Sequence, residues 1–265
     1  MMSNTTTQLT LWQRLSLEML WILCRGFALL PHFVRHHIFG TLCTFILRDL
    51  IHYRRAVIMD NLRRSFPDKS EAELNRICRG TYANLSEQII NTISQSGVSE
   101  KTLLHRMVIT NAEATRKAIN GRSAILLTAH YGPWEAGSTV SLVFPEQTIV
   151  AVYHKITSPV MDELMKRIRM HKNVELVDMK RTMRHFVDNR NKRPMAMGLI
   201  ADQNPVLRAN MRWYRFLHQW TAFFEGGETL AMKYHLPVYY FSPRRISAGH
   251  YEASFSLIYD GESPI

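Results

Sequence analysis

The spacing of apolar residues predicts helices throughout the first hundred positions. Segments 9–31 and 36–51 are rich in Leu, Phe and Trp, and a third apolar pattern with helical spacing follows them. Ser70 and Glu73 then form an S-x-x-E capping box, a pattern typical of the start of a helix. The helix that follows carries an apolar stripe made of Leu74, Ile77, Leu85, Ile89 and Ile93. We therefore expect residues 1–100 to form a helical region.

The pattern changes over residues 101–265, where short β-branched runs alternate with helical segments. The runs that we predict to be strands lie at 107–110, 124–129, 148–153, 174–178, 195–202, 237–243 and 251–259. Strands that alternate with helices are typical of a mostly parallel sheet covered by helices. The alternating polarity of the last run predicts an antiparallel edge, and we expect the aromatic stretch after residue 202 to be a loop. The sequence thus predicts an α/β fold with a mostly parallel central sheet flanked by helices.

The two N-terminal segments are apolar enough to suggest contact with a membrane. Arg14, Glu18 and Arg25 interrupt the first segment, so it is neither a clean spanning helix nor typical of a signal peptide. Apolar helices with Arg at their edges are typical of helices that lie in a bilayer interface. The alternative is that both are core helices of an ordinary globular protein.

The charge of the chain narrows the classes of partner. The formal net charge of +11 at pH 7 should attract phosphates, anionic lipid headgroups or an acidic protein. A nucleic-acid-binding module is the competing interpretation, but the sequence has no RRM, OB or helix-turn-helix signature. The three cysteines are irregularly spaced and do not predict a zinc site, so we expect no metal and no cofactor.

The stretch TAHYGPWEAG, residues 128–137, carries the strongest chemical pattern. His130 follows a predicted strand, and Glu135 falls just after a Gly-Pro turn, where we expect a helix to begin. A carboxylate that accepts one imidazole N–H leaves the other ring nitrogen free to act as a general base. Since no covalent nucleophile is evident, the substrate would supply the attacking hydroxyl. The alternative is that Glu135 only favours the helix N-terminus and that His130 is a satisfied loop residue.

The ordered motifs resemble those of the bacterial lipid A biosynthesis (late) acyltransferases, within the H-x4-D/E glycerolipid acyltransferase group. HYGPWE resembles the catalytic H-x4-E motif, and NLRRSFP at 61–67 resembles an N-L-x3-F-P element. RIR at 167–169 falls at the Arg block of the family and ADQNP at 201–205 at its Asp-containing strand end. FLHQWTAFFEGGETLA at 216–231 resembles a further conserved stretch. The sequence ends at Ile265, where that family usually continues into a basic, Trp-containing helical tail.

The resemblance implies a glycerol-3-phosphate acyltransferase-like fold and O-acyl transfer. The donor would be an acyl-carrier protein or acyl-CoA thioester, and the acceptor a phosphorylated lipid, with a lipid A precursor favoured. By position, His130 would be the general base and Glu135 its orienting carboxylate, while Arg167, Arg169 and Asp202 would bind substrate or shape the site. The family also implies a location at the cytoplasmic face of the inner membrane.

Several alternatives stay open at this point. The two arginines could belong to a solvated helix face, and Asp202 could be a capping residue. The acceptor could be a lysophospholipid or a glycolipid. The same His/Glu pair could also serve a hydrolase that uses water in place of a lipid hydroxyl.

Overall fold

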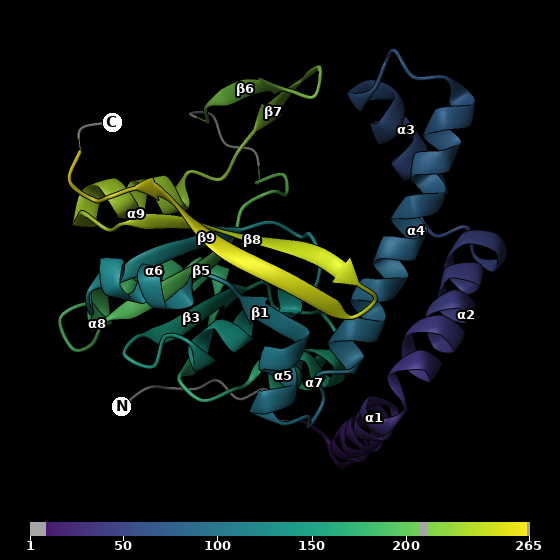
Figure 1. Ribbon diagram of the computed structural model, residues 1–265, viewed down its shortest axis with the longest axis horizontal. Coiled ribbons are helices and arrows are strands. Elements are labelled where there is room, and N and C mark those ends of the chain that lie inside the picture. The colour runs from purple at the N-terminus through teal and green to yellow at the C-terminus, as the bar shows by residue number, and fades with distance from the viewer. Residues whose placement is uncertain (1–8, 207–210, 264–265) are drawn as a thin grey trace.

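A computed structural model describes residues 9–206 and 211–263. Helices fill the first part of the described chain (Figure 1). They are α1 (Leu11–Leu29), the continuous segment η1 (Val34–Phe39), α2 (Gly40–Phe45) and η2 (Ile46–Leu50), α3 (Arg55–Ser65), α4 (Glu71–Ile93) and α5 (Glu100–Arg106). Glu73 and Ser70 form the predicted capping box at the start of α4, with hydrogen bonds in both directions. The helices predicted for this region are confirmed, while the division into domains at residue 100 stays a prediction.

The buried face of α4 differs in detail from the predicted apolar stripe. Leu74 is buried as expected. The buried residues that follow it at every fourth position are Cys78, Tyr82, Ser86 and Ile90. Ile89, predicted to be inside, is 36% exposed. Tyr82 donates its hydroxyl to the carbonyl of Tyr53, so the buried polar atom has a partner. Polar residues therefore share this interface, which a purely apolar pattern could not predict.

The central sheet has seven strands in the order β1-β9-β8-β2-β5-β3-β4. The strands are β1 (Met107–Ile109), β2 (Ala124–Thr128), β3 (Thr148–Tyr153), β4 (Val174–Asp178), β5 (Met195–Ile200), β8 (Val238–Ser247) and β9 (His250–Tyr259). Strands β8, β2, β5, β3 and β4 are parallel to one another, which confirms the mostly parallel sheet. The β9 strand runs antiparallel to β8, and β1 pairs with β9 in parallel, so these two form the antiparallel edge.

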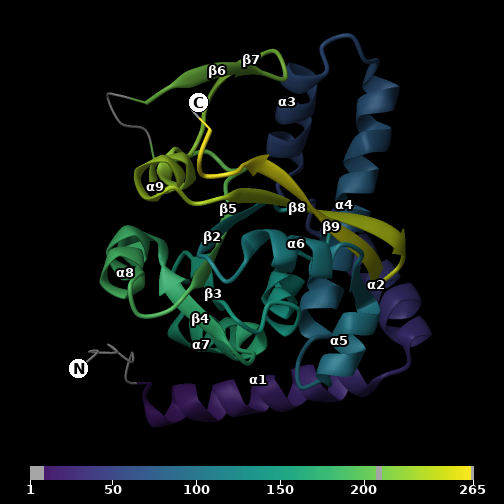
Figure 2. The same ribbon diagram turned by 60° about the vertical axis from the view of Figure 1, so that its left-hand side comes forward.

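The aromatic stretch that we expected to be a loop contains a hairpin. Strands β6 (Trp213–Phe216) and β7 (Gln219–Ala222) pair antiparallel in a separate two-stranded sheet. Leu217 and His218 form the turn, with φ of 47° and 64°. Gly or Asn usually occupies positions with such positive φ values, and this turn has neither. In Figure 2 this hairpin lies near α3, away from the central sheet, and Gln219 contacts Ser65 at 3.5 Å.

Helices cover both faces of the sheet. One face is covered by α6 (Ala112–Ile119) and by the 3-10 helix η3 (Trp134–Leu142). Ile119 of α6 and Val140 of η3 are buried there against strand residues such as Leu126. On the other face, α8 (Thr182–Asn189) and α9 (Gly226–Tyr234) bury Phe186 and Leu230. This layered packing of strands between helices is the predicted α/β architecture.

The N-terminal helix α1 packs against α7 (Pro159–Arg169) of the sheet region. Leu17 is 2% exposed and lies in an apolar cluster with Leu164 and Ile168. The opposite side of α1 is exposed. Among the described residues, no single helix has both the length and the apolarity needed to cross a membrane, and only α1 taken together with Val34–Leu50, across a 116° bend, passes on length and composition.

Candidate active site

His130 lies immediately after β2, at the edge of the sheet where the parallel strands end. Its backbone N–H donates to Oδ2 of Asp202 at 2.8 Å. Asp202 follows β5, the neighbour of β2, so the two residues occupy adjacent strand ends. The carboxyl ends of parallel strands are the usual position of ligand sites in α/β folds.

The same aspartate contacts the imidazole ring. Nδ1 of His130 lies 2.7 Å from Oδ1 of Asp202. Because an ionised carboxylate only accepts hydrogen bonds, Nδ1 carries the ring proton and donates a hydrogen bond to Asp202. The lone pair then lies on Nε2, which is 3.4 Å from the side-chain amide nitrogen of Gln203. With 29% of the His130 side chain exposed, Nε2 is in a position to receive a proton from a bound substrate.

Glu135, which we expected to orient the imidazole, makes its ion pair elsewhere. Arg169 donates from Nε and Nη2 to the two carboxylate oxygens of Glu135, both at 2.6 Å. The side chains are 13% and 7% exposed for Arg169 and Glu135, so this is a bidentate pair out of contact with most solvent. The Nδ1 partner of His130 is Asp202, so the expected hydrogen-bonding role of Glu135 passes to Asp202.

The local backbone also differs from the expectation. The segment after Pro133 is the 3-10 helix η3 and not the α-helix that we expected. Trp134, the first residue of this segment, borders two of the site residues, with its ring 4.8 Å from the His130 ring and 5.8 Å from the Arg169 guanidinium carbon.

Residues far along the chain support the turn before Trp134. Gly132 has φ of +62°, and a Cβ at this position would lie 3.3 Å from the ring of Tyr251. The Tyr251 hydroxyl donates to Oε1 of Glu87 at 2.6 Å, and Asn91 donates to the same hydroxyl at 3.3 Å. Burial raises the pKa of Tyr251, and the hydrogen bond to Glu87 raises it further, so the phenol stays a donor. No local motif predicts this support, because Tyr251 lies on β9 and its hydrogen-bond partners Glu87 and Asn91 lie on α4.

Arg167, predicted to bind substrate, joins two helices. Its Nη2 donates to Oε1 of Glu18 on α1 at 2.7 Å. The hydrogen bond to Glu18 raises the pKa of Arg167, and the same contact lowers the pKa of Glu18. The structure therefore places Arg167 on the α1 side of α7, while Arg169 lies beside Trp134 and Glu135.

The stretch 216–231, which resembles a family motif, contributes to packing behind the site. Gly227 lies in α9, where a Cβ would come within 3.2 Å of Leu199 and 3.5 Å of Leu127. A Cβ here would require the Leu199 side chain to give by a few tenths of an ångström, so α9 packs directly on side chains of β2 and β5, the two strands that end at His130 and Asp202. The glycine thus allows close packing beneath the candidate site.

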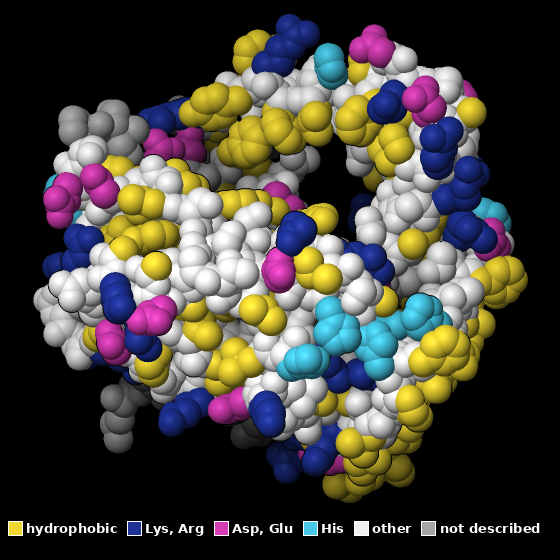
Figure 3. Space-filling model, in the orientation of Figure 1, with side chains coloured by type: hydrophobic (Ala, Val, Ile, Leu, Met, Phe, Trp, Pro, Cys, Tyr) yellow, Lys and Arg dark blue, Asp and Glu magenta, His cyan; other side chains and the backbone are white. Residues whose placement is uncertain are grey.

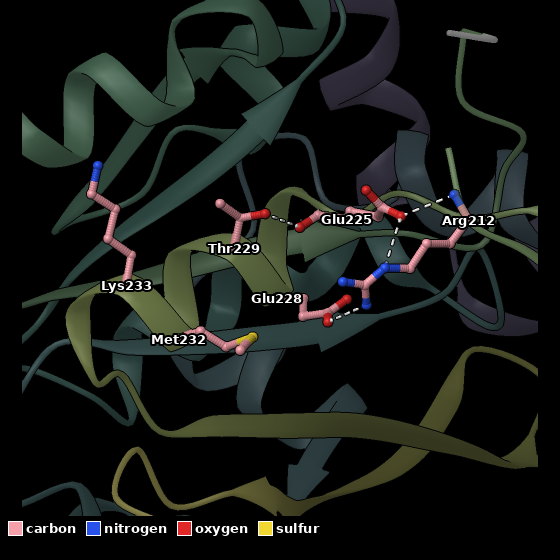
Figure 4. A pocket seen from close by; sticks show the side chains of 6 residues that line it. All are labelled: Arg212, Glu225, Glu228, Thr229, Met232 and Lys233. Carbon is pink, nitrogen blue, oxygen red and sulfur yellow. Dashed lines mark hydrogen bonds and ion pairs between the residues drawn. The ribbon is translucent and has the colours of Figure 1, made fainter. Parts of the chain in front are cut away.

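A hollow of about 380 Å³ lies over α9, away from these residues. It is lined by Arg212, Glu225, Glu228, Thr229, Met232 and Lys233 (Figure 4). Arg212 donates to Glu228 at 3.0 Å and its backbone N–H donates to Glu225 at 3.1 Å. Since none of the predicted site residues lines it and its walls are charged, this hollow is poorly suited to an acyl chain. Among the described residues, no group of three or more His, Cys, Asp or Glu side chains could hold a metal ion.

Comparisons with known proteins add one match. Residues 6–262 match the model of a family described as bacterial lipid A biosynthesis acyltransferase. A search of curated proteins found no match. The matched region includes both strand ends that carry His130 and Asp202, the η3 segment and α7.

Proposed function

Because the chain belongs to the bacterial lipid A biosynthesis acyltransferase family, we propose that it moves a fatty acyl chain from a thioester donor to a hydroxyl of a lipid A precursor. Family membership makes the protein an acyltransferase. The donor, an acyl-carrier protein or acyl-CoA, and the exact acceptor are part of the proposal. The observation that carries the mechanism is the contact of His130 Nδ1 with Asp202.

In this mechanism His130 is the general base. Nε2 takes the proton of the acceptor hydroxyl as its oxygen attacks the thioester carbonyl, since a free hydroxyl is too weak an acid to be deprotonated beforehand. An oxygen–carbon bond forms, the carbon–sulfur bond breaks, and the imidazolium returns the proton to the departing thiolate. Asp202 holds the reactive tautomer and stabilises the imidazolium that forms in between.

Glu135 and the two arginines have positioning roles in this proposal. The Glu135–Arg169 pair fixes Trp134, whose ring in turn borders His130. Arg167 ties the same helix to α1 through Glu18. Each guanidinium has a carboxylate partner within the chain, which favours shaping of the site over a direct grip on a lipid phosphate.

Apolar surface supports a lipid substrate and a membrane surface as partner. Exposed apolar side chains gather on α1 and on the segment Val34–Leu50, among them Leu11, Trp12, Leu15, Met19, Ile22, Leu23, Ile38, Leu42 and Phe45. Figure 3 shows apolar side chains concentrated at this end of the molecule. We place this surface against the cytoplasmic face of the inner membrane, where an acyltransferase reaches substrates that remain in the bilayer.

A second apolar surface suggests a place for acyl chains. Figure 3 shows a deep hollow between the β6–β7 hairpin and α3, with apolar side chains on its walls. Phe216 and Trp220 of the hairpin are 52% and 70% exposed, and Val57 of α3 is 46% exposed. The chain that leads to this hairpin starts at Gln203, the neighbour of His130 Nε2.

The test is a reconstituted reaction with each donor, acyl-carrier protein or CoA thioester, in the presence and absence of a lipid A precursor. We expect acyl transfer to the lipid and loss of transfer in His130→Ala with an unchanged unfolding midpoint. Release of free fatty acid at the same rate without acceptor would favour a hydrolase instead. Transfer only to a lysophospholipid or glycolipid would change the acceptor and leave the mechanism in place.

A further inference from the structure

Four imidazoles lie together where the N-terminal helical segment and α5 contact the β8–β9 turn, and Arg35 and Arg106 are the sequence neighbours of two of them. The ring of His32 lies 4.4 Å from that of His36 and 4.9 Å from that of His250, and the His105 ring lies 5.6 Å from that of His250. Figure 3 shows His side chains gathered on one face, next to the apolar side chains of the N-terminal helices. None of the candidate active-site residues belongs to this group, which we call the His–Arg cluster: His32, Arg35, His36, His105, Arg106 and His250.

Arg35 is the central observation in this cluster. The residue is 4% exposed, and its Nε and Nη1 atoms are inaccessible to solvent and without a hydrogen-bond partner among the described residues. Burial lowers the pKa of Arg35, which records the cost of keeping the charge away from water. Buried guanidiniums are normally paired with an acid because an uncompensated buried charge is strongly unfavourable. A binding partner of opposite charge would remove that cost.

A second, half-buried cation makes the local imbalance larger. Arg106 donates from Nη1 to the carbonyl of Ser94 at 2.7 Å, a neutral acceptor that leaves the charge uncompensated. Burial, with a contribution from the charge of Arg35, lowers the pKa of Arg106 to about 10. Two positive groups thus share one partly buried region.

Glu87, an acid whose charge acts on His36, is already engaged. Glu87 accepts hydrogen bonds from Arg245, Tyr251 and the backbone N–H of Gly249. Its charge is therefore matched by Arg245 and is only weakly available to Arg35 or Arg106. The cluster keeps an excess of positive charge that no described side chain neutralises.

Two of the imidazoles, His32 and His36, have lowered pKa values, chiefly because of burial, and contribute neutral donors in place of further charge. Burial, with smaller effects of His32 and Arg35, lowers the pKa of His36 to about 4, so this ring is neutral at pH 7. The turn above it packs closely: a Cβ at Gly249 would lie 2.5 Å from Nε2 of His36. The turn therefore packs directly on the His36 and His32 rings and holds them in place.

We propose that the His–Arg cluster is a binding site for a phosphate group, separate from the acyl-transfer site. Guanidinium forks match the geometry of phosphate oxygens, and neutral imidazole N–H groups add donors. The helical segment that supplies Arg35 and His36 also carries exposed apolar residues, with Phe33 63% and Ile38 52% exposed, so the cluster shares a segment with the surface proposed to meet the membrane. A phosphomonoester on a lipid headgroup suits this location, and free phosphate shares the same chemistry.

The test measures phosphate-dependent stability of the full chain in detergent. We expect sodium phosphate, at an ionic strength matched with sodium chloride, to raise the Tm of the wild type by at least about 3 °C. Arg35→Met should lose this shift and yet melt no lower than the wild type in phosphate-free buffer, because it removes an unpaired buried charge. Arg79→Met, which removes an exposed arginine from α4, should keep the full shift.

Arg35→Lys supplies a variant that keeps the charge and loses the fork. We expect it to fold and to show a smaller phosphate shift than the wild type. A phosphate shift in Arg35→Met equal to that of the wild type would overturn the proposal. So would a large loss of stability of Arg35→Met without phosphate, since that result requires an internal partner for the guanidinium.

Vesicles distinguish the two sources of the phosphate. Binding to phosphatidylcholine vesicles that contain phosphatidic acid is compared with binding to phosphatidylcholine alone, for the wild type and Arg35→Met. An Arg35-dependent gain with phosphatidic acid identifies a lipid phosphomonoester as the ligand. A shift with free phosphate and no such gain identifies a soluble phosphate. Failure of both arms to depend on Arg35 rejects the site, and since neither arm measures acyl transfer, the proposed function is unaffected.

Discussion

The Nδ1 atom of His130 lies 2.7 Å from Oδ1 of Asp202, although 72 positions separate the two residues in the chain. The second oxygen of the same carboxylate accepts the backbone N–H of His130. One aspartate therefore fixes both the position of the residue and the tautomer of its ring. This relationship depends on the parallel pairing of β2 with β5, which brings the two strand ends side by side.

Asp202→Asn should lower the rate of acyl transfer by roughly 10²–10⁴-fold, because an amide neither enforces the tautomer nor stabilises the imidazolium. Turnover of purified variant and wild type, at matched protein concentration, measures the effect. Gln203→Ala, next in sequence and only 3.4 Å from Nε2, is the control and should change the rate less than about tenfold. Activity near the wild-type level in Asp202→Asn would contradict the role of this carboxylate.

The Glu135–Arg169 pair should behave as a buried ion pair. Glu135→Leu or Arg169→Met alone should lower the free energy of unfolding by about 3–5 kcal/mol, since each leaves one charge without a partner. The double variant Glu135→Leu with Arg169→Met should cost less than the sum of the single changes. Denaturant unfolding of the four proteins completes the cycle. Additive losses would show that the two charges are not coupled.

Glu87 should make stability depend on acid pH. Burial alone would raise its pKa, but hydrogen bonds from Tyr251, Gly249 and Arg245 outweigh burial, so the pKa is lowered from its ordinary value of 4.5. A carboxyl with a lowered folded-state pKa stabilises the protein above its unfolded-state value, and this stabilisation is lost as the pH falls through the folded-state pKa. We expect unfolding midpoints to fall as the pH drops below about 4.5, and Glu87→Gln to flatten part of that fall. An identical pH profile in the variant would contradict the prediction.

Gly132→Ala tests the turn before Trp134. A φ of +62° disfavours any residue with a Cβ by roughly 1–2 kcal/mol, and contact with Tyr251 at 3.3 Å adds to this cost. Gly137→Ala is the matched control, because a Cβ there meets nothing within 4 Å and its φ is not positive. Thermal unfolding should separate the two variants, with a lower Tm for Gly132→Ala alone. Equal melting of the two would show that the turn tolerates a side chain.

The exposed face of α1 should mediate membrane binding. Ile22→Glu together with Leu15→Glu removes two exposed apolar side chains and adds two charges, which should weaken partition into anionic vesicles at least about tenfold. Met183→Glu is the control, because it changes an exposed apolar side chain on α8, and it should bind vesicles nearly as the wild type does. Sedimentation with vesicles measures the bound fraction. Unchanged binding of the α1 variant would place the membrane surface elsewhere.

Local patterns in the sequence determined the elements of the fold. Strands β3 and β4 have the predicted bounds because short β-branched runs between polar turns leave little freedom, and the capping box fixed the start of α4. The hairpin at Trp213–Ala222 was missed, since its turn residues Leu217 and His218 carry none of the usual turn signals. Likewise, the helical pattern after Pro133 did not reveal a 3-10 helix, because both helix types place apolar residues three to four positions apart.

The order of the motifs also let the sequence indicate the family and the candidate residues His130 and Asp202. Which carboxylate meets the imidazole was decided only by the tertiary structure, which sets Asp202 against His130 and Glu135 against Arg169. The physical reason is that hydrogen bonds and ion pairs act over about 3 Å, whereas sequence spacing restricts distance only within one helix or strand. Contacts such as Gly132 with Tyr251, or the ring of His32 with that of His250, arise from chain crossings that no local pattern encodes.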